Sequence, residues 1–75
     1  MTLFTAAVFD ATVDVDGHEL FRGKGAAEGW AAKLAKEIET DVTVRKIGPG
    51  WALCAQVDGE EGLWGVMGQR LKRIN

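Results

Sequence analysis

The residues with the clearest chemical potential lie in the run FDATVDVDGHELF, from Phe9 to Phe21. The segment D-V-D-G within it is similar to part of a calcium-binding loop, where carboxylates at alternate positions coordinate the ion before a glycine turn. Aligned on Gly17, the first and last ligand positions of such a loop fall on Thr12 and Gly23, which carry no carboxylate. We therefore expect a tight turn and no metal site.

Catalytic groups are sparse in the rest of the chain. His18 is the single histidine, Cys54 is the single cysteine, and serine is absent. No nucleophile–base pair can be assembled from this set, and a zinc site with several Cys and His ligands is excluded by count. We predict that the protein is not an enzyme and uses no cofactor, and we interpret Cys54 as a small core residue.

A glycine-rich segment, RGKGAAEGW, precedes an expected helix. Two glycines around a lysine could hold a phosphate, but neither the Walker pattern nor G-x-G-x-x-G is present, since Glu28 stands where the third glycine would be. We expect a flexible link into the helix, with Gly25 as a weak N-cap.

Four acidic residues around the D-G turn are the strongest candidate for a binding surface: Asp10, Asp14, Asp16 and Glu19. Side chains two residues apart on a strand share one face about 7 Å apart, near the spacing of phosphates along a nucleic-acid strand. Like charges in a row destabilise a strand, so such a row needs a reason. A charged row can also serve only to prevent edge-to-edge aggregation, and the sequence leaves both interpretations.

A basic group in the second half of the chain gives the alternative: Arg45, Lys46, Arg70, Lys72 and Arg73. These residues could bind nucleic acid or an acidic protein. Residues 1–40 carry four Lys/Arg and seven Asp/Glu, and residues 41–75 carry five and four, so the halves sum to −3 and +1. Because the whole chain is mildly acidic, we rank direct nucleic-acid binding below protein binding.

The three tryptophans are the largest apolar groups in a chain without tyrosine. Trp30 is predicted to lie in the core, because it falls on the apolar stripe of the expected helix. Trp51 and Trp64 begin neighbouring strands and are expected to be half exposed, which makes Trp64 a candidate contact for a partner.

Length and composition limit the architecture to one domain over residues 1–75. The chain is 47% hydrophobic and 27% charged, as expected for a folded globular protein. The single cysteine gives no internal disulfide, the N-terminal apolar run has no positive residue ahead of it, and no run is long enough to span a membrane. A cytoplasmic protein is the expectation.

The elements that must position these groups follow from hydrophobic periodicity. Strict alternation over residues 7–16 predicts a strand, Asp16-Gly17 predicts a type I′ turn, and the returning strand then pairs Val15 with His18 and Val13 with Leu20. Apolar spacing of three and four predicts a helix over 26–39. Strands follow at 42–47, 51–57 and 63–67, separated by turns at 48–50 and 58–62, and residues 68–75 fit either a helix or a further strand. The expected fold is α+β, in the order ββαβββ, with an antiparallel sheet covered on one face by the helix.

In size, in the acidic strand DATVDVD and in its lack of catalytic groups, the chain resembles the small proteins that bacteriophages encode to inhibit host defences, the anti-CRISPR inhibitors among them. The resemblance implies stoichiometric binding to a CRISPR–Cas surveillance complex in the host cytoplasm. There the four acidic residues would oppose lysines and arginines that normally hold DNA. Open sheet edges make a homodimer as plausible as a monomer.

Overall fold

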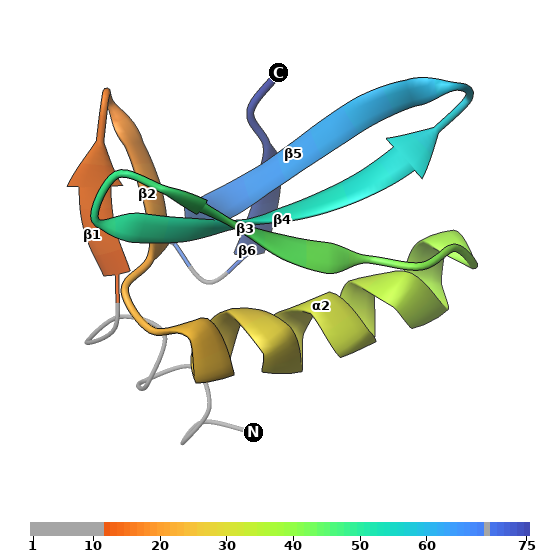
Figure 1. Cartoon of the computed structure of the whole chain (residues 1–75), viewed down its shortest axis with the longest axis horizontal. Coiled ribbons are helices and arrows are strands. Elements are labelled where there is room, and N and C mark those ends of the chain that lie inside the picture. The colour runs from red at the N-terminus through yellow and green to blue at the C-terminus, as the bar shows by residue number, and fades with distance from the viewer. Residues whose placement is uncertain (1–11, 69) are drawn as a thin grey trace.

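A computed structural model describes residues 12–68 and 70–75, which form one helix and an antiparallel sheet of six strands (Figure 1). The elements are β1 Thr12–Val15, β2 His18–Phe21, α2 Lys24–Ile38, β3 Thr43–Ile47, β4 Gly50–Val57, β5 Glu60–Met67 and β6 Arg70–Arg73. The predicted α+β fold, with the helix along one side of an antiparallel sheet, is confirmed. The undecided C-terminal segment adds a strand, β6, to the predicted order.

The first hairpin follows the predicted register. Asp16 and Gly17 form the turn with φ values of 52° and 85°, and Val15 pairs with His18 while Val13 pairs with Leu20. Both turn residues need positive φ, which Asp tolerates and Gly adopts freely. The earlier part of the predicted strand, including Asp10, lies outside the described residues.

The turn between β4 and β5 is also a two-residue Asp-Gly turn, and it is shorter than predicted. Asp58 and Gly59 have φ values of 54° and 80°, and Val57 pairs directly with Glu60. The prediction of a turn over residues 58–62 is therefore wrong, because a type I′ turn needs only two residues. Glu60 and Glu61, which looked like turn residues by composition, belong to β5.

The helix begins two residues earlier than predicted and ends one earlier. Gly23, not Gly25, is the N-cap, and it has no side chain to bond the free amides of the first turn. Glu39 closes the helix in the left-handed conformation, with φ of 56°. Ala27 and Ala31 are buried on the face toward the sheet, where small side chains allow a close approach.

The core between α2 and the sheet consists of Phe21, Ala27, Ala31, Leu34, Leu53 and Val66. Leu20 is buried as well, but it points to the opposite face of β2 from Phe21, since successive strand residues alternate. There it lies against Gly50 and Gly65, where a Cβ atom would stand 2.8 Å and 3.1 Å from Leu20 side-chain atoms. At Leu20 and Phe21 both faces of β2 are therefore buried, where the sequence indicated one apolar face.

Strand β4 is the centre of the sheet. Leu53 pairs with Val44 of β3 on one edge and with Trp64 of β5 on the other. Strand β2 contacts β4 through Phe21 and Trp51 and contacts β5 through Glu19 and Val66, and β6 extends the sheet beyond β5. No helix in the described part of the chain is long and apolar enough to cross a membrane.

Candidate functional site

The acidic residues that the structure describes lie together on the β1–β2 hairpin. Asp14 is directly opposite Glu19, and Asp16 is in the turn that joins the strands; all three are exposed. Glu19 accepts a hydrogen bond from the Thr12 hydroxyl at 3.0 Å. Within the described residues neither Asp14 nor Asp16 is in an ion pair. The structure thus brings these three predicted site residues together, while Asp10 is not described.

A groove of about 440 Å³ is lined by residues of this hairpin and of β5, β6 and the segment after β6. Asp14 and Glu19 line it together with Met67 and Lys72. Met67 is 54% exposed, and among the described residues it is the one large hydrophobic side chain that is mostly open to solvent. The acidic hairpin therefore borders an accessible apolar contact, which the sequence did not indicate.

Trp64 is half-buried and packs against the core. It lies in the middle of β5, whereas the sequence placed it at the beginning of a strand. Trp64 and Val66 are two residues apart and therefore point to the same face of β5. Val66 is the cross-strand partner of Glu19, so Trp64 lies two residues along β5 from the point where the acidic hairpin pairs with it. The Arg73 guanidinium lies 5.6 Å from the ring centroid of Trp64. Trp30 also packs against the core as predicted, but it is half-buried rather than fully buried.

The five predicted basic residues do not form one surface. Arg45 and Lys46 are on β3, whereas Arg70, Lys72 and Arg73 are on β6, and β4 and β5 separate the two strands. Neighbours within each strand also point to opposite faces of the sheet.

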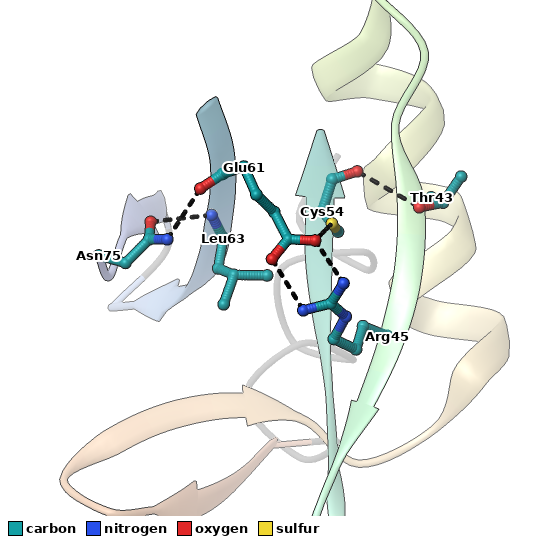
Figure 2. A network of polar contacts seen from close by, with 6 residues as sticks. All are labelled: Thr43, Arg45, Cys54, Glu61, Leu63 and Asn75. Atoms are coloured by element: carbon teal, nitrogen blue, oxygen red, sulfur yellow. Dashed lines mark hydrogen bonds and ion pairs between the residues drawn. The ribbon is translucent and has the colours of Figure 1, made fainter. Parts of the chain in front are cut away.

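Arg45 belongs to a polar network on the sheet face away from α2, which Figure 2 shows in close view. Its guanidinium forms a bidentate ion pair with the carboxylate of Glu61, with the Nη1 donor 2.9 Å from Oε1. The pair crosses β4, because Arg45 comes from β3 and Glu61 from β5. The thiol of Cys54, on β4 between them, donates to Glu61 Oε2 at 3.3 Å (Figure 2).

Asn75 joins the same network from the end of the sheet. Its side-chain oxygen accepts from the Leu63 amide and its side-chain nitrogen donates to the Glu61 carbonyl, both at 3.0 Å (Figure 2). The Ile74 amide donates to the Leu63 carbonyl at 2.9 Å. These bonds hold the segment after β6 against β5 without charge.

The network shifts the pKa values of its members in directions that make it unreactive. The bonds that Arg45 and Cys54 donate lower the pKa of Glu61, and the Glu61 carboxylate raises the pKa of Arg45. Burial and then the bond to Glu61 raise the pKa of the Cys54 thiol. A thiol with a raised pKa has little thiolate at neutral pH and is a poor nucleophile, so this network is best described as structural.

A second groove, of about 530 Å³, lies between α2 and β3 on the helix side of the sheet. Trp51 lines it, with Lys24 of α2 and Lys46 of β3 placed over its ring at 5.7 Å and 5.6 Å from the centroid. Lys46 is the cross-strand partner of Trp51. Lys24 was not a predicted site residue, because only the packing of α2 on the sheet brings it there.

No group of three or more His, Cys, Asp or Glu side chains in the described ranges could hold a metal ion. Comparison of the chain with protein-family models, curated proteins and solved structures gives no significant match. The case for a function therefore depends on the geometry of the described residues.

Proposed function

We propose that the protein is a small non-catalytic binding module that contacts a protein partner through the acidic β1–β2 hairpin. The observation that carries the proposal is the pairing of Asp14 with Glu19. Carboxylates directly opposite each other on two strands, with Cβ atoms about 5 Å apart, repel and destabilise the hairpin. A cation of a partner between them would relieve that repulsion, which supports a role of the pair in binding.

The neighbouring residues support a protein partner. Met67, at the rim of the hairpin groove, supplies an accessible apolar contact beside the charges. A partner arginine or lysine has the matching shape, because its aliphatic stem packs on apolar groups while its head reaches a carboxylate. Trp64 lies two positions from Val66, on the face of β5 opposite to Met67, and there it offers the partner a second contact.

The partner we propose is a protein whose basic surface normally holds nucleic acid, as in a CRISPR–Cas surveillance complex of a host cell. The hairpin would occupy that surface stoichiometrically and block DNA binding in the cytoplasm. The alternative, nucleic acid bound directly by the five basic residues near the C-terminus, has less support because the structure distributes them over two separated strands.

The proposal is tested by measuring target-DNA binding by purified surveillance complexes of several CRISPR–Cas types in the presence of increasing protein. Loss of DNA binding that saturates at a fixed molar ratio is expected with at least one complex. Asp14→Asn with Glu19→Gln should abolish the inhibition. Glu37→Gln with Asp41→Asn, which makes the same charge change away from the hairpin, should retain it. Equal loss in both variants, or no inhibition of any complex, would contradict the proposal.

A further inference from the structure

The groove between α2 and β3 is lined by Trp51 and Lys24, and a second cation, Lys46 of β3, lies over the same ring. Trp51 is half-buried on β4, Lys46 reaches it from the adjacent position of β3, and Lys24 reaches it from the first turn of α2. Residues 24, 46 and 51 are distant along the chain, so the arrangement is a product of the fold. The uncapped start of α2 adds the positive end of the helix dipole near Lys24.

These groups match the chemistry of a nucleotide. A base stacks on an exposed aromatic face, and each such contact contributes about 1–3 kcal/mol in single-stranded binding proteins. The ammonium groups of Lys24 on α2 and Lys46 on β3 can contact the phosphates that flank the base. An acidic peptide would use the lysines but would leave the ring without a planar partner.

We propose that the α2–β3 groove binds single-stranded nucleic acid, with one base against Trp51 and the adjoining phosphates against Lys24 and Lys46. This goes beyond the proposed function and does not depend on it, because the acidic hairpin contributes no residue to the groove. The binding is independent of sequence, since every base presents a flat face to the ring.

One residue in the groove opposes the ligand. Glu28 lies one helical turn after Lys24 and lines the same groove, so its carboxylate repels a phosphate there. Neutralising it is expected to strengthen binding, a gain that a damaged fold cannot produce. Glu37→Gln, which changes the charge by the same amount farther along α2, is the matched control and should leave the affinity unchanged.

The direct test uses fluorescence anisotropy of a labelled oligothymidylate of about 12 nucleotides, within the usual site sizes for such proteins. The wild type should bind at low salt. Lys24→Gln with Lys46→Gln should weaken binding about tenfold and reduce the slope of log K against log salt by about 1.4, because each single-strand phosphate contact contributes about 0.7. Lys36→Gln with Lys72→Gln removes the same charge outside the groove and should lose much less affinity for the oligonucleotide.

The aromatic contact is tested separately. Trp51→Leu should weaken binding about tenfold or more, while Trp30→Leu, which removes a half-buried tryptophan of α2 that does not line this groove, should bind as the wild type does. Melting curves identify variants that fail to fold. If Trp51→Leu is one of them, the affinities of Lys24→Gln with Lys46→Gln and of Glu28→Gln test the proposal in its place. A duplex of the same length and thymidine monophosphate should both bind weakly. Absence of binding by the wild type, equal loss in the control pair, or equal binding of duplex would overturn the proposal.

Discussion

Arg45 and Glu61 lie on the two strands that flank β4 and join across it above the Cys54 thiol, so one ion pair links three strands of the sheet (Figure 2). Both side chains are substantially exposed, at 47% and 39%. Water and salt therefore screen the attraction, and its contribution to stability is small. The contribution of this ion pair to stability is nevertheless expected to depend on pH, because it requires an ionised Glu61 carboxylate.

The pKa of Glu61 predicts how that contribution varies with pH. Because the folded state lowers this pKa from its ordinary value of 4.5, the stabilisation is fully present above that value and is lost as pH falls through the folded pKa. Melting temperatures of the wild type and Glu61→Gln should differ at about pH 6 and converge toward about pH 3. Glu60→Gln, which removes a neighbouring carboxylate outside the network, should differ less from the wild type in melting temperature at about pH 6. A difference between the wild type and Glu61→Gln that grows as the pH falls would contradict the prediction.

The same network predicts the reactivity of Cys54. Burial and Glu61 together raise the pKa of the thiol above its ordinary value of 9.0, so alkylation by iodoacetamide should be slow at neutral pH. Glu61→Gln should move the midpoint of the pH–rate profile downward, because the carboxylate no longer disfavours the thiolate. Arg45→Gln should move it upward, because the guanidinium favours the thiolate. Midpoints that move in the same direction would show that access, and not charge, governs the reaction.

Gly65 should tolerate no side chain. A Cβ there would stand 2.6 Å from the Glu19 carbonyl and 3.1 Å from Leu20, and the backbone cannot yield without separating β2 from β5. We expect Gly65→Ala to lower the free energy of unfolding by about 1–3 kcal/mol. Gly25→Ala, in α2 with nothing within 4 Å of the added atom, should raise it by about 0.5 kcal/mol. Urea denaturation of both variants checks the pair, and an unchanged midpoint for Gly65→Ala would contradict the packing.

Sequence periodicity was sufficient for the elements whose signals are local. The type I′ register at Asp16-Gly17 and the stripe of α2 depend on residues within one turn or one hairpin, and both are found as predicted. Composition was misleading at Glu60 and Glu61, because polar residues after Asp58-Gly59 read as a loop although the two-residue turn is complete before them. The double burial of β2 was missed because Phe21 and Leu20 are adjacent and alternation assigns only one of them to a core.

The candidate sites show the same division. The acidic hairpin was predictable because Asp14, Asp16 and Glu19 are joined by one short turn. The groove at Trp51 was not, because Lys24 approaches it only through the packing of α2 on the sheet. The predicted basic group does not form one patch because its members lie on β3 and β6, and β4 and β5 stand between these two strands.

The last prediction separates folding from binding at the acidic hairpin. Asp14→Lys replaces a repulsive pair by an attractive one opposite Glu19 and should raise the free energy of unfolding by about 0.2–1 kcal/mol. The same change places a cation where the proposed partner brings its own, so inhibition of DNA binding by the surveillance complex should be lost. Asp14→Thr keeps strand propensity and relieves the repulsion without adding an attraction. Its free energy of unfolding should therefore lie between those of the wild type and Asp14→Lys. Destabilisation of the protein by Asp14→Lys would mean that the pair of Asp14 and Glu19 serves the fold, and would contradict its proposed role in binding.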